Sequence, residues 1–179
     1  MFTGRTEYHS TPEVAALTLE RATPDDAAAI AMVRTAAADD LTTRFGVGHW
    51  SSLATERSVL SSMDSSSLWV MRQGREVIAT LRLATRKPWA IDPSYFTRSQ
   101  RPLYLTDMAV HPRVQRTGVG RRCLEDVQRI ARAWPADAIR LDAYDAPAGA
   151  GPFYAKCGYR EVGRATYRGT PLIYFEFLL

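Results

Sequence analysis

Alternating apolar and polar residues predict short strands along this chain, and longer periodic runs predict helices between them. A repeat of about two residues is typical of strands, and a repeat of about 3.6 residues is typical of helices. The dipeptide Gln73-Gly74 is a hairpin signal between two of the strands. The predicted strands cover residues 17–21, 68–71, 77–83, 103–110, 139–144, 159–167 and 172–178, and the predicted helices cover about 24–40, 52–62, 118–134 and 148–156.

The order of these elements, β-α-α-β-β-β-α-β-α-β-β, predicts one α/β domain with a mixed sheet. The chain has 179 residues, of which 46% are hydrophobic, and this is enough for a sizeable core. Residues 1–16 are polar and show no periodicity, so we expect a flexible leader before a domain of residues 17–179. Residues 85–101 combine prolines, basic residues and aromatic residues, which predicts a long loop of a kind that is often functional.

Charge, cysteine content and hydropathy exclude several classes of protein. The formal net charge of +4 suits an anionic ligand but is too small to indicate nucleic-acid binding. Cys123 and Cys157 belong to no CxxC pair, so we expect reduced thiols in a cytoplasmic protein. We find no signal peptide and no run of about 20 apolar residues, and we expect no contact with a membrane. The histidines show no metal-ligand spacing, so no metal is expected.

The segment from Leu105 to Arg122 carries the most specific pattern. A predicted strand ends at His111-Pro112, and a turn with Gly118 and Gly120 leads directly into a helix. The first amides of a helix lack partners and carry a positive partial charge, so such a turn can hold a phosphate. A plain turn is the alternative. The segment lacks the third glycine of the dinucleotide fingerprint, where Cys123 stands, and the lysine of a P-loop.

Three motifs in this order resemble the GNAT superfamily of N-acetyltransferases. Residues 115–120 (QRTGVG) resemble its Q/R-x-x-G-x-G/A signature, residues 107–112 (DMAVHP) resemble its fourth strand, and residues 151–160 (GPFYAKCGYR) resemble its FYEKLGF segment. The resemblance covers residues 17–179. It implies a mixed, mostly antiparallel central sheet flanked by helices, with acetyl-CoA bound where the fourth and fifth strands splay apart.

The resemblance also implies which residues hold acetyl-CoA. The backbone of Met108, Ala109 and Val110 should pair with the pantetheine arm. The amides that should hold the pyrophosphate are those of Gln115, Arg116, Thr117, Gly118, Val119, Gly120 and Arg121. The family often has an asparagine where this chain has Pro147, so one side-chain contact to coenzyme A is missing here.

For the chemistry, the resemblance implies direct transfer in a ternary complex, with Tyr154 as the acid that protonates the departing thiolate. The alternative for Tyr154 is an aromatic ring packed beneath the sheet. Asp107 is the candidate base, although it could equally be a structural carboxylate. Asp142 and Asp145 are further candidates, and a carboxylate would need burial or a water relay to act as a base near neutral pH. Neither cysteine is placed as a nucleophile.

The acceptor is expected to be a primary amine of a small molecule or a peptide. Loops 41–52 and 85–101 should shape its pocket, with Trp50, Trp89, Tyr95 and Phe96 as aromatic walls. His49 could line the pocket or belong to an ordinary loop. Two other functions stay open: a non-catalytic sensor of acyl-CoA and a protein N-terminal acetyltransferase. The apolar C-terminus, residues 174–179, could be core or the interface of a homodimer.

Overall fold

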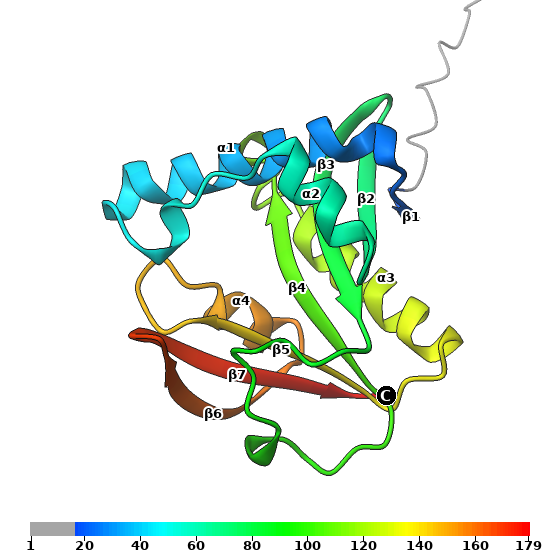
Figure 1. The fold of residues 1–179 in the computed structure, drawn as a ribbon, viewed down its shortest axis with the longest axis vertical. Coiled ribbons are helices and arrows are strands. Elements are labelled where there is room, and N and C mark those ends of the chain that lie inside the picture. The colour runs from blue at the N-terminus through cyan, green and yellow to red at the C-terminus, as the bar shows by residue number, and fades with distance from the viewer. Residues whose placement is uncertain (1–16) are drawn as a thin grey trace, which may run out of the picture.

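The computed structural model describes residues 17–179, and the predicted leader lies outside the described residues. Its centre is a seven-stranded sheet with the order β1-β2-β3-β4-β5-β7-β6 (Figure 1). Only β4 and β5 are parallel, and all other neighbours are antiparallel. The strands are β1 (Leu19–Arg21), β2 (Ser67–Gln73), β3 (Glu76–Ala84), β4 (Pro102–Val110), β5 (Ala138–Tyr144), β6 (Arg160–Tyr167) and β7 (Thr170–Leu178). The predicted mixed sheet is confirmed.

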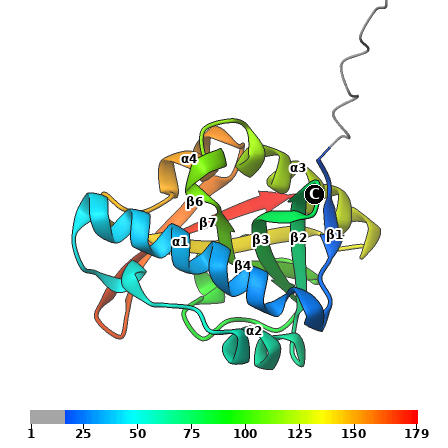
Figure 2. The ribbon, with the colours of Figure 1, turned by 90° about the horizontal axis from the view of Figure 1, so that it is seen from above.

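Helices cover both faces of the sheet (Figure 2). They are α1 (Ala27–Phe45), α2 (Glu56–Met63), α3 (Val119–Ala133) and α4 (Gly151–Lys156). On one face, α1 and α2 bury Ile30 and Val59 against Val70 of β2. On the other face, α3 buries Leu124 and Val127 in the main core. No helix within residues 17–179 is both long enough and apolar enough to cross a bilayer.

The third cluster of buried residues lies under the long loop before β4. Ile91 and Phe96 of this loop pack against Tyr104 and Tyr174. The hydroxyl of Tyr174 donates to the carbonyl oxygen of Ala90 at 2.5 Å. The loop is therefore fastened to the β5–β7–β6 half of the sheet, and the apolar end of the chain forms an internal strand, since β7 lies between β5 and β6.

Strands β4 and β5 pair at only three positions, from Pro102–Ala138 to Tyr104–Arg140. Beyond these pairs the two strands separate, as Figure 1 shows, because β5 continues along β7 instead. The splay that the resemblance implied is confirmed. It leaves the β5 side of β4 without a neighbouring strand from Leu105 onward, within the part of the chain that the structure describes.

A β-bulge lies in β4 at the point where the two strands diverge. Thr80 pairs with Ala109 and Arg82 pairs with Thr106, so Asp107 and Met108 both stand opposite one residue of β3. Asp107 has a φ of 51°, in the left-handed region. A bulge breaks the alternation of side chains and redirects them. As a result, Asp107 and Met108 both face the gap between the strands.

Three helix boundaries differ from the prediction, and one of them is the start of α2, which lies at Glu56 and not at residue 52. Helix α1 continues to Phe45, and Gly46 ends it with a φ of 80°, as is typical of a glycine after a helix. Helix α4 begins at Gly151, later than predicted, because the preceding residues form a turn in which the Gly149 amide donates to Ala146. The extra turn of α1 matters for the site, since it carries the following loop across to β5.

Candidate active site

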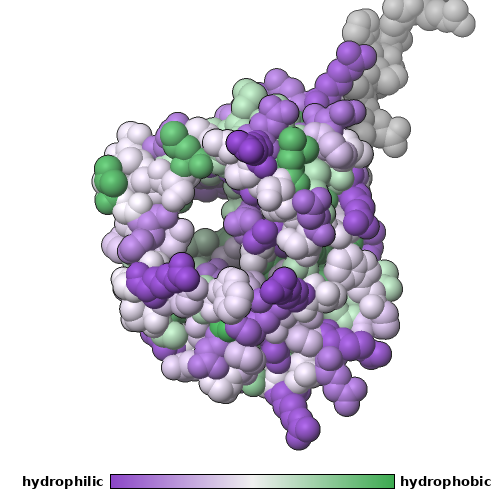
Figure 3. All heavy atoms as spheres, in the orientation of Figure 1, coloured by the Kyte–Doolittle hydropathy of each residue, from purple (hydrophilic) through white to green (hydrophobic). Residues whose placement is uncertain are grey.

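A cavity of about 370 Å³ lies in the gap between β4 and β5. Figure 3 shows the molecule hollowed between α1 and the β5 side of the sheet. Strands β3, β4 and β5, the helices α1 and α4 and the turn before α4 all contribute to the walls. The polar side chains that line it are Arg82, Thr106, Asp107, Asp142, Tyr144 and Tyr154.

Tyr154 brings a buried phenol into this cavity from α4. The residue is 8% exposed, and its hydroxyl lies 3.9 Å from the sulfur of Met108 on β4. Burial is the largest cause that raises the pKa of Tyr154, and the negative charge of Asp142 adds to it. The phenol is therefore protonated at neutral pH. Its ring packs on Tyr159 and Phe175, and the residue also lines the cavity.

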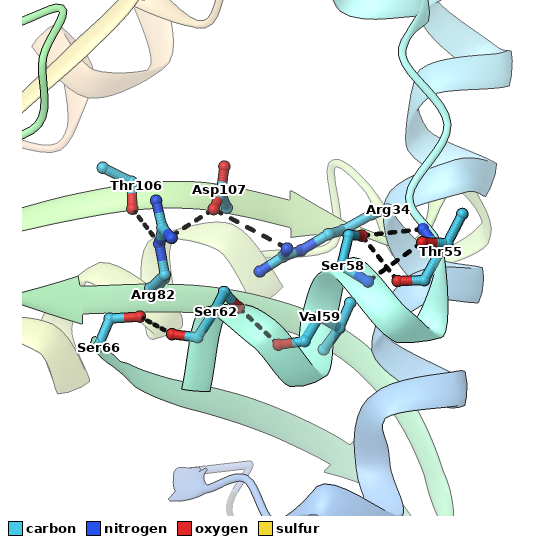
Figure 4. Close-up of polar contacts among 9 residues, drawn as sticks. All are labelled: Arg34, Thr55, Ser58, Val59, Ser62, Ser66, Arg82, Thr106 and Asp107. Carbon is cyan, nitrogen blue, oxygen red and sulfur yellow. Dashed lines mark hydrogen bonds and ion pairs between the residues drawn. The ribbon is translucent and has the colours of Figure 1, made fainter. Parts of the chain in front are cut away.

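Asp107 is held by two arginines (Figure 4). Its Oδ2 lies 3.1 Å from Nε of Arg82 on β3 and 3.9 Å from Nη1 of Arg34 on α1. Arg82 Nε also donates to Thr106 Oγ1 at 2.9 Å. The carboxylate of Asp107 is thus shared by two guanidinium groups that come from different elements of the fold. The sequence placed Asp107 correctly in the cavity but gave no sign of these partners.

Asp142 on β5 lines the same cavity without an arginine partner among the described residues. Burial, followed by the negative charge of Asp107, raises the pKa of Asp142 above its usual range. The pKa of its neighbour Tyr144 is raised by burial, then by Asp142 and Asp107. The third carboxylate that the sequence offered, Asp145, instead pairs with Arg164 at 3.1 Å and does not line the cavity.

Next to the cavity, β4 ends and α3 begins in a turn built around Gly118. Gly118 precedes the first helical residue with a φ of 97°, and a Cβ there would meet no atom within 4 Å. Gln115 ties the turn to the strand, since its Nε2 donates to the Val110 carbonyl at 3.0 Å. Thr117 Oγ1 donates to Val114 at 2.7 Å. The first amides of α3 have no carbonyl within the helix to pair with, and they face an open approach.

Gly120 also has a packing role that its pattern did not indicate. A Cβ on Gly120 would lie 3.1 Å from Cζ of Phe153 and 3.8 Å from Cγ2 of Val110. The glycine thus lets α3 approach α4 and the end of β4 closely. This contact places the start of α3 beside the residues that carry Tyr154 into the cavity.

The arginines of the turn are mostly engaged by the protein itself. Arg113 pairs with Glu76, Arg121 donates to the Lys156 carbonyl at 3.3 Å, and Arg122 donates to the Leu17 carbonyl at 2.9 Å. Arg116 has a positive φ of 61°, and its side chain has no hydrogen-bond or ion-pair partner within residues 17–179. Arg116 is therefore the arginine of this turn whose side chain stays free of protein partners in the described chain.

The loop after α1 reaches across the mouth of the cavity and contacts β5 and β7. We call residues 46–51 the strap. The Tyr144 hydroxyl donates to the His49 carbonyl at 3.1 Å, and His49 Nδ1 lies 3.1 Å from Oγ1 of Thr170. The rings of His49 and Trp50 pack on Tyr144, with centroid distances of 6.4 Å and 6.1 Å. The strap thus contacts Tyr144, which forms one wall of the cavity, but of the predicted loop 41–52 only Leu41 lines the cavity itself.

The expectation for loop 85–101 is wrong in its placement. None of its residues lines the cavity, because the loop packs on the β5–β7–β6 part of the sheet. Phe96 is buried in the core there, while Trp89 and Tyr95 line a separate groove with Tyr167. Trp50 contacts Tyr144 at the mouth but does not line the cavity either. Tyr144 is the aromatic wall that the sequence did not single out.

The cysteines offer no nucleophile. Burial raises the pKa of the Cys123 thiol to about 12, so its reactive thiolate is not populated at neutral pH. Burial also raises the pKa of Cys157. Among residues 17–179 no group of three or more His, Cys, Asp or Glu side chains is arranged to hold a metal ion. The polar chemistry of the site lies in carboxylates, arginines and phenols.

The splayed strands β4 and β5 and the glycine turn that opens α3 are the arrangement that the resemblance to acetyl-CoA-dependent transferases implied. Residues 23–159 match the acetyltransferase (GNAT) family, and the chain belongs to that family. The protein is thus an acyltransferase by family, and acetyl-CoA is the co-substrate of the family. The comparison with curated proteins gives no match.

Solved structures share this fold at low identity. A GCN5-related N-acetyltransferase from Rhodopseudomonas palustris has a TM-score of 0.68 at 19% identity, over 95% of this chain and 100% of that one. A putative acetyltransferase from Salmonella typhimurium, solved with acetyl-CoA, has a TM-score of 0.66 at 16% identity, over 92% and 94%. The ribosomal-protein-S18-alanine N-acetyltransferase from Escherichia coli has a TM-score of 0.64 at 16% identity, over 90% and 93%.

Proposed function

We propose that this protein transfers an acetyl group from acetyl-CoA to the primary amine of a small molecule. The observation that carries the proposal is the coincidence of three features in one gap: the unpaired edge of β4, the amides at the start of α3 and the phenol of Tyr154. Each suits a different part of the co-substrate, and the chain brings them together from distant segments.

The residues at the gap fit acetyl-CoA. A strand edge without a neighbour can pair with an extended chain that carries amide groups, and the pantetheine arm is such a chain. We assign this pairing to the backbone of Met108, Ala109 and Val110. The amides from Gln115 to Arg121 are assigned to the pyrophosphate, because the open turn at Gly118 leaves them accessible.

Tyr154 and Asp142 are assigned the proton transfers. The acceptor enters as an ammonium ion, whose nitrogen loses one proton before it attacks the thioester and a second as the C–N bond forms and the C–S bond breaks. Asp142 receives one of them and passes it to solvent, since its raised pKa makes it a better base than an ordinary carboxylate. The other proton passes to the Tyr154 oxygen as the phenol gives its own proton to the sulfur, so the phenol is protonated again at the end of the reaction.

The raised pKa of Tyr154 sets how it acts. A thiol has a pKa of about 8.5, well below that of a buried phenol, so full proton donation by the phenol alone is uphill. The hydroxyl therefore stabilises the developing negative charge on sulfur by a hydrogen bond. The phenol proton moves to the sulfur only when a proton from the acceptor nitrogen replaces it. We assign Asp107, the base candidate of the sequence pattern, to holding Arg82 instead, because two arginines share its Oδ2.

The strap favours a small acceptor over a protein N-terminus. A polypeptide substrate needs an open groove along the mouth of the site, and the contacts of His49 with Tyr144 and Thr170 bridge that mouth. A sensor that only binds acyl-CoA would not need the phenol of Tyr154 and the carboxylate of Asp142 in the cavity between β4 and β5. Both side chains line the same cavity here.

The test combines binding and turnover. Isothermal titration with acetyl-CoA should show binding to one site, and release of free thiol should follow when a panel of primary amines is added. Binding without thiol release across the panel would support the sensor. Faster release with peptides than with any small amine would support the peptide acetyltransferase. Absence of acetyl-CoA binding would refute the proposal as a whole.

A further inference from the structure

The cavity between β4 and β5 contains a cationic side chain, Arg82, which has no part in the proposed proton transfers. Arg82 projects from β3, and its side chain is 27% exposed. Its Nε contacts Thr106 Oγ1 at 2.9 Å and Asp107 Oδ2 at 3.1 Å. Among residues 17–179 nothing accepts from Nη1 or Nη2, and these two nitrogens form the forked end of the guanidinium group. Such a fork matches the two oxygens of a carboxylate.

The charges around Arg82 leave one positive charge uncompensated. Arg34 and Arg82 share a single carboxylate, that of Asp107, so the group has two positive charges and one negative. Arg34 is largely buried, and its Nε and Nη2 have no hydrogen-bond partner in the described chain. Burial lowers the pKa of Arg34, and the charge of Arg82 adds to this, although an arginine stays protonated. An anion beside Arg82 would relieve both effects.

The wall of the cavity that β5 forms carries an acidic side chain instead of a basic one. Asp142 lies on β5, across the gap from β3 and β4, and Tyr144 and Tyr154 flank it. Asp142 has no cationic partner among the described residues, so an ammonium group would be its natural counterion. The cavity is thus polarised across the splay: positive on the β3 side and negative on the β5 side.

We propose that the acceptor is an amino acid whose carboxylate binds the free Nη1 and Nη2 of Arg82 while its amine faces Asp142 and Tyr154. This inference rests on the proposed acetyl transfer and narrows its substrate to molecules with both charges. Asp107 and Thr106 fix the guanidinium group by its Nε and leave the fork directed to the substrate. Arg82 is then the residue that determines acceptor specificity.

The size of the cavity agrees with a small zwitterion. About 370 Å³ is at the low end of the range for ligand pockets, and the thioester end of the co-substrate must share it. The strap bridges the mouth with the hydrogen bond between Tyr144 and His49. Both features leave room for a free amino acid and little for an extended chain.

The test compares acceptors that differ only in the carboxylate. Thiol release is measured with each standard amino acid, and the best acceptors are then compared with their α-carboxamides and with the amines that lack the carboxyl group. We expect kcat/KM to fall by about ten- to a hundredfold when the carboxylate is removed, since a hydrogen bond to a charged group is lost. Equal rates for acids, amides and amines would overturn the inference.

Variants at Arg82 link the preference to this side chain. Arg82→Gln should remove most of the preference for the acid over the amide, mainly through KM, and Arg82→Lys should keep part of it because a lysine retains the charge without the fork. Arg75→Gln is the matched control, since Arg75 lies exposed in the turn after β2. A preference that survives Arg82→Gln would overturn the assignment to Arg82.

Titration with acetyl-CoA separates this inference from the proposed function. All three variants should bind acetyl-CoA as the wild type does, which also shows that they are folded. If the wild type binds acetyl-CoA and acetylates amines but no amino acid, the inference fails and the proposed function stands. If it does not bind acetyl-CoA, the proposed function itself fails.

Discussion

The hydroxyl of Tyr144 on β5 donates a hydrogen bond to the carbonyl oxygen of His49 in the strap, at 3.1 Å. The two residues are far apart in the sequence, and their contact joins the end of α1 to the splayed strand. His49 extends the bridge to β7 through Thr170 Oγ1 at 3.1 Å. The strap therefore bridges the space between α1 and the strands β5 and β7 beside the cavity.

We expect Thr170→Val to loosen the strap without disturbing the cavity. Thr170 does not line the cavity, so the substitution removes only its contact with His49. The KM for the acceptor should rise about two- to fivefold, in line with the loss of one hydrogen bond, and the Kd for acetyl-CoA should not change. Hydrogen exchange of residues 46–51 should become faster. Thr166→Val is the control, because the exposed side chain of Thr166 has no hydrogen-bond partner among the described residues. Equal effects of both variants would argue against the strap.

Tyr154→Phe should lower kcat by about tenfold or more, because the sulfur loses its hydrogen-bond donor. The affinity for acetyl-CoA should stay within about threefold, since the ring still packs on Tyr159 and Phe175. Steady-state rates and titration check the two parts. An unchanged kcat would exclude Tyr154 as the acid.

Tyr159→Phe is the matched control for this experiment. Tyr159 belongs to the same aromatic cluster, and its buried hydroxyl has no hydrogen-bond partner within the described residues. Removing an unsatisfied polar group is neutral or stabilising. The variant should keep its kcat and its Tm, and a loss of kcat equal to that of Tyr154→Phe would mean that both changes act through packing.

The strands and α3 could be predicted from the sequence because their signals are local. Each of these elements has one buried side, so apolar residues recur at a fixed spacing along it. This spacing is visible as alternation in residues 77–83 and 103–110 and as helical periodicity in residues 118–134. The motif around Gly118 was likewise contiguous. This is why the fold and the glycine turn before α3 were predicted with nearly the observed boundaries.

The acceptor half of the site could not be predicted in this way. Arg34, Arg82 and Asp107 come from α1, β3 and β4, and they meet only because a bulge turns Asp107 toward the arginines. An aspartate with a positive φ has no fixed sequence signal. The one available signal was Arg82 itself, a charged residue within an otherwise apolar predicted strand.

The placement of loop 85–101 failed for a related reason. Its composition predicted an irregular segment, but its position depends on long-range contacts. Thr97 donates its amide to Glu176 at 3.2 Å, and Arg140 donates to the Thr97 carbonyl at 2.7 Å. Glu176 is fully buried, and a buried carboxylate needs such partners. Nothing in the loop itself indicates which face of the sheet offers them.

Asp142→Asn should slow the reaction and stabilise the protein. Burial and the charge of Asp107 raise the pKa of Asp142, so the unfolded chain loses this proton at a lower pH than the folded protein does. Stability is therefore lost as the pH rises from about 4 through the raised pKa, and an asparagine avoids this loss. The Tm of the variant should exceed that of the wild type at pH 7, with a smaller difference near about pH 3.

Asp107→Asn should have the opposite effect on stability. It leaves Arg34 and Arg82 without their shared carboxylate, and an uncompensated buried charge is destabilising. Its Tm should fall below that of the wild type at pH 7. If both aspartate variants shift Tm in the same direction, the contrast that we draw between the two carboxylates is wrong.

Gly118 and Gly120 should respond to alanine in different ways. At Gly118 an alanine must adopt a φ of 97°, and its methyl group enters open space beside the first amides of α3. The strain of about 1–2 kcal/mol would shift the turn, so the Kd for acetyl-CoA should rise about tenfold. At Gly120 the new methyl group would lie 3.1 Å from Phe153, so Tm should fall. Adding Phe153→Leu should restore Tm in the Gly120 variant but not acetyl-CoA binding in the Gly118 variant. If Gly118→Ala binds acetyl-CoA as tightly as the wild type, the amides at the start of α3 do not hold the pyrophosphate.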